Sequence, residues 1–360
     1  MTQQAVEVMK PLELPAVVRR RLTGAELAGL AGLGAIALLP IPFGSFGFFV
    51  GQFALIYAIL GLSVVVVTGY AGLVSLMTYS FAGIGAMVTG IAMASWGWPF
   101  WLALPLAAAA TIPVSVIVGV TSVRLKGLYL AIATLTFADA LGETFFKWDR
   151  ATGGLSGWVV SRPHPFRSDA SYYVLLLVVA MGLVWMVTGL RSSRVGRAML
   201  AVRTNEREAQ ALGINVYKTK LTAFLISGAL GGIGGSFLAL LLKQVTRSAF
   251  QSPLVEATSI LLVTVVVIGG IDRPLGAFLG AVALVVQQQV FQGARFFFAY
   301  FGIYSAALLV LFLLYRPGGL MQVVRLQWRL IQTRPRVGII STALIIGLNV
   351  GLAWLFVRLS

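Results

Sequence analysis

The feature that most constrains this chain is a series of apolar segments, each about 20 residues long and separated by short polar turns. A segment of this length can cross a hydrocarbon layer about 30 Å thick as a single α-helix. The sequence therefore predicts an all-α polytopic membrane protein. We place ten spans at residues 25–43, 46–67, 72–95, 98–122, 127–146, 171–190, 219–241, 256–271, 274–292 and 297–315, and an extra C-terminal span at 337–357.

Composition supports a membrane protein and excludes several kinds of site. Hydrophobic residues make up 59% of the 360 residues and charged residues 11%, whereas soluble domains hold about 45–50% and about 25%. Cysteine is absent, so the chain has no disulfide and no thiol nucleophile. His164 is the only histidine, which argues against a histidine-based metal centre. We expect no metal site and no catalytic residue.

The net charge of +16 predicts an orientation in the membrane. With the amino terminus inside, 19 of the 27 Lys and Arg residues fall on the cytoplasmic side. Cytoplasmic loops of membrane proteins carry such an excess. Binding to nucleic acid is therefore not needed to explain the charge.

The spans divide the chain into three parts. Residues 1–24 form a basic cytoplasmic leader, because the apolar run that follows continues into a full span without an A-x-A-type cleavage site. Residues 25–320 form the transmembrane domain, interrupted by a cytoplasmic loop at 191–218. Residues 321–360 hold a basic cytoplasmic segment and the extra C-terminal helix.

The central loop contains a segment unlike its surroundings, RVGRAMLAVRTNEREAQALGINVYK, from Arg194 to Lys218. Asn205 and Glu208 have capping-box spacing, and Gly213 can take the left-handed conformation that closes a helix. The pattern predicts a two-turn helix at 206–212, about 10 Å long. A solvated charged loop is the alternative, but two caps around one short helix favour a docking element.

Stretches throughout the chain carry a family resemblance. The segments are GYAGLVSLMTYSFAGIGAMVTG, RLKGLYLAIATLTFADAL, ATGGLSG, GRAMLAVRTNEREAQALGINVYKTKLTAFLISGALGGIGGSFLA, VVIGGIDRPLGAFLGA and LYRPGGL. In this order, over about residues 45–320, they resemble the permease subunits of branched-chain amino acid ABC importers.

This resemblance implies a type II-like ABC importer permease fold and a transmembrane subunit that is not itself an enzyme. No G-x-x-x-x-G-K-[ST] phosphate loop occurs in the sequence, in agreement with that expectation. The implied partners are two ATP-binding subunits that hold ATP and magnesium, a second permease subunit in a heterodimer, and an extracytoplasmic solute-binding protein. The implied location is the bacterial inner membrane, with lipid around a multi-pass chain.

The resemblance also gives the loop a role, that of the coupling helix which rests on an ATP-binding subunit. The residues we expect at this contact are Arg197, Arg203, Asn205, Glu206, Arg207, Glu208, Ala209 and Gly213. The arginines can pair with acidic groups of the partner. Gln210 replaces the second alanine of the family's Glu-Ala-Ala signature, and one residue fewer precedes the glycine, which leaves the register of the contact open.

Polar residues at membrane depth are candidates for the translocation path, because such residues face a cavity or a partner. Asp139 and Glu143 lie one turn apart on one helix face, and Thr136 extends that stripe. The remaining candidates are Ser75, Thr78, Tyr79, Ser80, Phe81 and Thr134. Two alternatives stay open: Glu143 as an interfacial residue, and the hydroxyl-rich patch at 75–80 as helix packing.

A glycine-rich stretch, GALGGIGGSF at 228–237, offers a thin surface for close helix packing within a bilayer. A nucleotide-binding reading is rejected, because no strand precedes the stretch and it lies at membrane depth.

Departures from the family pattern leave the substrate open. Met77 and Thr78 stand where the family has glycine and histidine, and Asp272 and Arg273 follow the paired glycines, where a small uncharged turn is usual. A branched-chain or hydrophobic amino acid is the default substrate, and urea, an amide or a carboxylate remain open. The rival function is a proton-coupled secondary transporter that uses Asp139 and Glu143; a membrane-embedded enzyme lacks any catalytic pairing.

Overall fold

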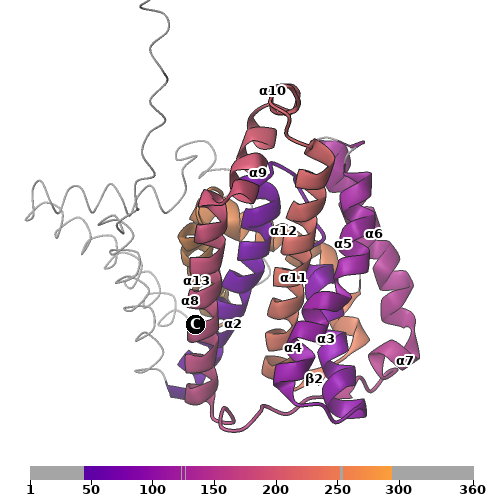
Figure 1. Ribbon diagram of the computed structural model, residues 1–360. Coiled ribbons are helices and arrows are strands. Elements are labelled where there is room, and N and C mark those ends of the chain that lie inside the picture. Colours follow the sequence, from indigo (N-terminus) through magenta and orange to yellow (C-terminus); the bar gives the residue numbers. More distant parts are fainter. Residues whose placement is uncertain (1–43, 123, 126, 252–253, 294–360) are drawn as a thin grey trace, which may run out of the picture.

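The computed structural model describes residues 44–122, 124–125, 127–251 and 254–293. They form a bundle of helices with one two-stranded sheet (Figure 1). The elements are α2 Gly44–Val64, η4 Val65–Tyr70, α3 Thr78–Gly90, η5 Ile91–Ser95, α4 Phe100–Ala110, α5 Ile112–Thr121, α6 Leu128–Glu143, η6 Phe145–Lys147, α7 Asp149–Thr152, β1 Trp158–Val159, α8 Asp169–Ser192, α9 Arg194–Thr204, α10 Glu206–Ala211, α11 Val216–Leu242, β2 Gln244–Val245, η7 Arg247–Phe250, α12 Leu254–Gly269 and α13 Pro274–Gly293.

Five helices within these ranges are long and apolar enough to cross a membrane, or six if one bent pair counts as a single span. These five are Gly44–Tyr70, Phe100–Thr121, Leu128–Lys147, Asp169–Ser192 and Val216–Leu242. They confirm a polytopic helical protein. The spans expected at 25–43, 297–315 and 337–357 lie outside the described residues, so the total of ten plus one stays a prediction.

Helix α11 is the central element of the bundle, and its glycines determine how closely its neighbours approach. A Cβ atom added to Gly235 would lie 1.9 Å from the carbonyl oxygen of Ala82 in α3, and one added to Gly85 would lie 2.2 Å from that of Gly232. Backbone therefore meets backbone where α3 crosses α11, which is the packing that small residues permit in membranes. The role expected for the glycine-rich stretch is confirmed.

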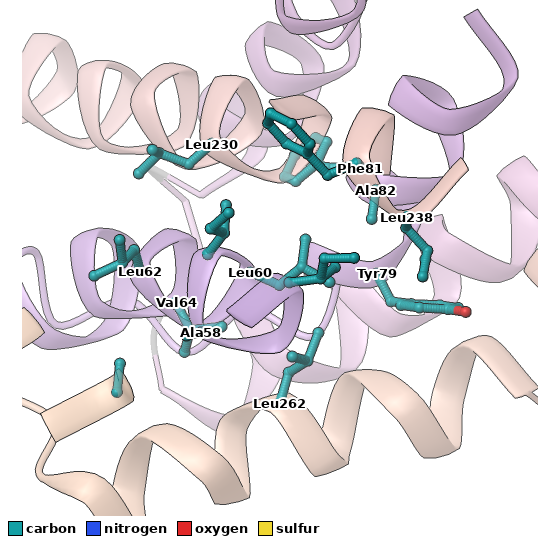
Figure 2. Packing of buried hydrophobic residues seen from close by; sticks show 14 of the residues in the cluster. Ala58, Leu60, Leu62, Val64, Tyr79, Phe81, Ala82, Leu230, Leu238 and Leu262 are labelled. Carbon is teal, nitrogen blue, oxygen red and sulfur yellow. The ribbon is translucent and has the colours of Figure 1, made fainter. Parts of the chain in front are cut away.

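The apolar core lies around this crossing. Figure 2 shows side chains of α2 lying between those of α11 and α3 on one side and Leu262 of α12 on the other. Two hydroxyl pairs join the same helices: Ser63 and Ser227 are 2.8 Å apart, and Thr89 donates to Ser236 over 2.8 Å. Because an unpaired hydroxyl is costly in an apolar interior, these pairs fix the rotation of α11 against its neighbours.

Two expected spans are interrupted, and two others form a bent pair. Residues Gly72–Met77 are not helical, so the span expected at 72–95 begins as a helix only at Thr78. Helices α4 and α5 together have the length of one membrane span, Phe100–Thr121, and Thr111 separates them. The expected spans 256–271 and 274–292 correspond to α12 and α13, which together are long and apolar enough for one span and are bent by 115° at the turn between them. Their separate crossing of the membrane stays a prediction.

The two ends of the bundle are built differently. Helices α9 and α10 project from one end, and α7 and the sheet lie at the other (Figure 1). At the sheet end the Arg162 guanidinium is buried: it donates to Asp169 over 2.7 Å and to Gln52 over 3.3 Å, and lies 4.4 Å above the Tyr172 ring. These contacts attach the loop before α8 to α2 and α8.

Candidate functional site

The short helix α10 has the caps expected from the sequence. The Asn205 side-chain oxygen accepts from the backbone N–H of Arg207 at 3.0 Å and from that of Glu208 at 3.5 Å, and its amide donates to the Glu208 carboxylate over 2.6 Å. Gly213 has a φ of +80° and follows Leu212, the C-cap residue that ends the helix. The helix runs from Glu206 to Ala211, one residue shorter than expected.

Two contacts hold α10 against the bundle. Ala209 packs in a small apolar cluster with Val202 of α9 and Val216 of α11. The Glu206 carboxylate lies 2.8 Å from the Lys220 ammonium, whose side chain is 0% exposed. A buried cation needs a partner charge of this kind. Ala209 and Glu206 therefore face inward and fix the position of the helix.

The opposite side of α10 is free of such contacts and faces solvent. Arg207, Glu208 and Gln210 are exposed there, and Gly213 follows them at the tip of the loop. Leu212 is 79% exposed, which makes it an apolar side chain presented at the very end of the bundle. Sequence reasoning did not select Leu212, because its exposure is visible only in the structure.

The two arginines of α9 that we expected at the partner contact are engaged within the chain. Arg197 donates to the carbonyl of Ser192 over 2.5 Å. Arg203 donates to the Asp272 carboxylate and to the carbonyl of Gly69. Arg203 thus forms an ion pair with the turn between α12 and α13, and its expected pairing with a partner acid stays a prediction.

A shallow hollow of about 470 Å³ lies beside α10. Its walls come from the end of α9, from the first turn of α10 and from the start of the unwound segment, which we define as the non-helical residues 72–77. The lining residues are Ala71, Gly72, Leu73, Val202, Arg203, Thr204, Asn205, Glu206 and Arg207. The hollow therefore lies between the first turn of α10 and the start of the unwound segment.

Most of the path candidates gather where the unwound segment enters α3. Ser75, Thr78 and Ser80 are buried. Tyr79 and Phe81 are buried beside them, with the Tyr79 ring 5.3 Å from that of Phe250. The hydroxyl oxygens of Thr78 and Ser80 have no hydrogen-bond partner among the described residues. Buried polar atoms of this kind call for an explanation such as water or a passing solute.

Helix α6 approaches this segment through one threonine. The Thr134 hydroxyl is buried and accepts from the backbone N–H of Leu76 over 3.0 Å. The stripe formed by Thr136, Asp139 and Glu143 lies elsewhere on α6: Thr136 is exposed, Asp139 is half-buried, and Glu143 is exposed and paired with Lys147. The structure therefore brings Thr134, but not Thr136 or Glu143, to the unwound segment.

Sequence reasoning also missed Lys220 and Asp272, the two charges that anchor the loop. Lys220 is basic and close to a helix start, which is typical of a solvated residue, and only its burial shows otherwise. Asp272 stood out as an unusual charge after paired glycines, which was the available signal. Among the described residues, no group of three His, Cys, Asp or Glu side chains could hold a metal ion.

A family model described as "Branched-chain amino acid transport system / permease component" matches residues 48–313. The chain belongs to this family. It is 31% identical over 312 residues to the high-affinity branched-chain amino acid transport system permease protein LivM of Salmonella typhimurium, covering 78% of this chain and 71% of that protein. Its identity to LivM of Escherichia coli is 30% over 313 residues, with the same coverage. The LivH permease of Escherichia coli is 26% identical over 167 residues, 46% of this chain and 52% of that protein.

No solved structure matches the chain. Membership of the permease family makes the chain a membrane component of an ABC transport system and not an enzyme. Together with its apolar helices, it identifies a multi-pass protein of the inner membrane. ABC importers of this family work with ATP-binding and substrate-binding partners.

Proposed function

We propose that this chain is the permease subunit of an ATP-driven importer and that α10 is the helix through which ATP-binding subunits act on it. The observation that carries the proposal is the division of α10 into two faces. Glu206 and Ala209 hold the helix rigidly from inside, while Leu212 and Arg207 are presented outward at the end of the bundle. A secondary transporter has no need of a capped, anchored helix with an exposed leucine.

In this proposal the chain itself binds no cofactor. Two ATP-binding subunits hold ATP and magnesium and rest on α10 and on its counterpart in a second permease subunit. The positive-inside distribution then places α9, α10 and the amino terminus in the cytoplasm. A solute-binding protein would deliver substrate at the opposite end, where α7 and the sheet lie.

Helix α6 supports a second permease subunit. The most apolar 18-residue stretch of its span, Leu128–Lys147, is only 28% buried within the chain, which leaves a surface that a second permease subunit can cover. We propose that this subunit is a different permease, because the relatives include two permeases of different name, LivM and LivH of Escherichia coli.

The proposed substrate is a branched-chain or other hydrophobic amino acid. This rests on the family and on the two LivM relatives, whose names give branched-chain amino acids as their cargo. The buried side chains of Tyr79 and Phe81, with the hydroxyls of Thr78 and Ser80 beside them, would suit contact with a small solute that has one apolar and one polar end. Urea, an amide or another carboxylate would fit the same hydroxyls and are outcomes of the test.

The test is purification of the tagged chain from its native host in mild detergent, followed by reconstitution of what co-purifies. We expect ATP-binding subunits and a second permease in the preparation, no ATP hydrolysis by the chain alone, and uptake of L-leucine that requires ATP. Uptake should persist when an ionophore collapses the proton gradient in vesicles loaded with ATP. Loss of uptake under that condition would favour the proton-coupled transporter, and uptake of urea instead of leucine would reassign the substrate.

A further inference from the structure

Three segments far apart in the sequence meet at the Arg203 side chain. Arg203 belongs to α9, directly before the coupling helix. Its guanidinium donates to the Asp272 carboxylate, in the turn between α12 and α13, and to the carbonyl of Gly69, at the end of η4. Its side chain is 34% exposed, so the ion pair lies at the surface of the bundle end.

Glycines at this junction leave no room between the segments. A Cβ atom on Gly69 would lie 2.1 Å from the carbonyl oxygen of Ile271, and one on Gly72 would lie 2.7 Å from the Cγ atom of Arg203. Gly72 also has a φ of +71°, a conformation that other residues resist. The turn, the end of η4 and the arginine stem are therefore in direct contact.

Arg191, at the end of α8, adds a second tie to the same turn. It donates to the backbone carbonyl of Asp272, and its guanidinium lies 5.8 Å from the centre of the Tyr70 ring. Asp272 is thus contacted by two arginines from the segment that leads to the coupling helix, Arg191 at its backbone carbonyl and Arg203 at its carboxylate.

The junction continues directly into the proposed path. Beyond Gly72 the chain runs unwound to Met77, held by the Thr68 hydroxyl on the Leu73 carbonyl at 3.0 Å and by Thr134 on the N–H of Leu76 at 3.0 Å. A segment without internal helical bonds can shift without breaking a helix. The turn at this junction also connects the two helices of the bent pair α12–α13.

We infer that Arg203 and Asp272 form a transmission clasp, defined as the ion pair together with the contacts of Arg203 to Gly69 and Gly72. The clasp makes α9 and α10 move as one unit with the α12–α13 turn and with the unwound segment 72–77. Arg203 is then a positioning residue that conveys displacement of the coupling helix to the path, and not a residue that touches the ATP-binding subunit. The inference rests on the proposed function.

The absence of cysteine allows a direct test of this transmission. Val74→Cys places one thiol in the unwound segment, and its reaction rate with a water-soluble maleimide is measured in the full complex, with and without ATP and magnesium. With Arg203 present, we expect ATP to change the rate about fivefold or more, within the usual range of coupling between sites. Arg203→Gln and Asp272→Asn should each remove the ATP effect, and Arg203→Lys should restore part of it.

The double variant with Arg203→Gln and Asp272→Asn should reduce the ATP effect no more than either single variant, because both substitutions act on one interaction. The matched control is Arg194→Gln, which removes a charge from an exposed position at the start of the same helix. It should leave the ATP effect intact. Co-purification of the ATP-binding subunits should be unchanged in all the variants.

Two results would overturn the clasp. One is an equal ATP effect in the parent and in Arg203→Gln; the other is loss of the ATP-binding subunits from Arg203→Gln at normal membrane level, which would make Arg203 a docking residue. Failure of the parent chain to bind any ATP-binding subunit would instead overturn the proposed function.

Discussion

Helices α11 and α6 are both long and apolar enough to cross a membrane, but the chain uses them in opposite ways. Of the most apolar 18-residue stretch in each span, 72% is buried within the chain for Val216–Leu242, which is α11, and 28% for Leu128–Lys147, which contains α6. Glycines in α11 meet neighbouring backbone, whereas a Cβ atom on Gly142 of α6 would meet nothing within 4 Å. The comparison shows a helix that completes its packing within this subunit beside one that leaves most of its surface for lipid, solute or a partner.

Charged pairs near the two helices provide the test of this difference with the largest expected effect. Glu206 pairs with Lys220, a fully buried residue of α11, while Glu143 of α6 pairs with Lys147, and both of their side chains are more than half exposed. Removing one partner of a buried pair costs about 3–5 kcal/mol, and an exposed pair contributes about 0–1 kcal/mol. Glu206→Ala should therefore strongly lower the melting temperature of the purified chain, and Glu143→Ala should hardly change it.

Equal melting temperatures for these two variants would mean that Lys220 finds water or another partner once Glu206 is gone. The coupling helix would then be held less firmly than its contacts indicate.

Glycine substitutions give the next largest effect. Gly235→Ala would drive a methyl group into the Ala82 carbonyl, and overpacking of this kind costs about 1–3 kcal/mol. Gly142→Ala has open space and gains about 0.5–1 kcal/mol from helix propensity. Thermal unfolding in detergent should show loss of stability for the first and none for the second. A destabilised Gly142→Ala variant would place an unseen neighbour on α6.

A smaller effect, on transport alone, is expected from the acids of α6. Asp139→Asn should lower leucine uptake severalfold more than Glu143→Gln, because Asp139 is half-buried on a spanning helix and Glu143 is exposed beside Lys147. Membrane level should be the same for both. Near-normal uptake by both variants would show that the stripe plays no part in the path.

The sequence predicts those parts of the fold that depend on local chemistry. The caps of α10 follow from Asn205, Glu208 and Gly213, whose conformations are determined by neighbours within a few residues. Close packing of α11 follows from its glycines alone. The helices α2, α8 and α11 begin and end near their expected limits because long apolar runs leave few alternatives in a membrane.

What the sequence could not predict depends on contacts between distant residues. Residues 72–77 are unwound although largely apolar, and Thr68 and Thr134 bond the carbonyl of Leu73 and the N–H of Leu76 within them. The burial of Lys220 and the inward turn of Arg203 depend on Glu206 and Asp272, which local patterns do not connect. Charge in a loop indicates an interaction but does not say whether the partner is in the same chain.

The central claim, that α10 receives the ATP-binding subunit, is tested most directly by a matched pair of exposed leucines. Leu212 beside α10 is 79% exposed, and Leu155, at the end that holds α7 and the sheet, is 80% exposed. Leu212→Glu and Leu155→Glu introduce the same charge at equal exposure, so both chains should reach the membrane at the parent level. In a pull-down of the tagged chain, we expect the ATP-binding subunit to be lost from Leu212→Glu and kept by Leu155→Glu. Retention of the subunit by both variants would contradict the claim.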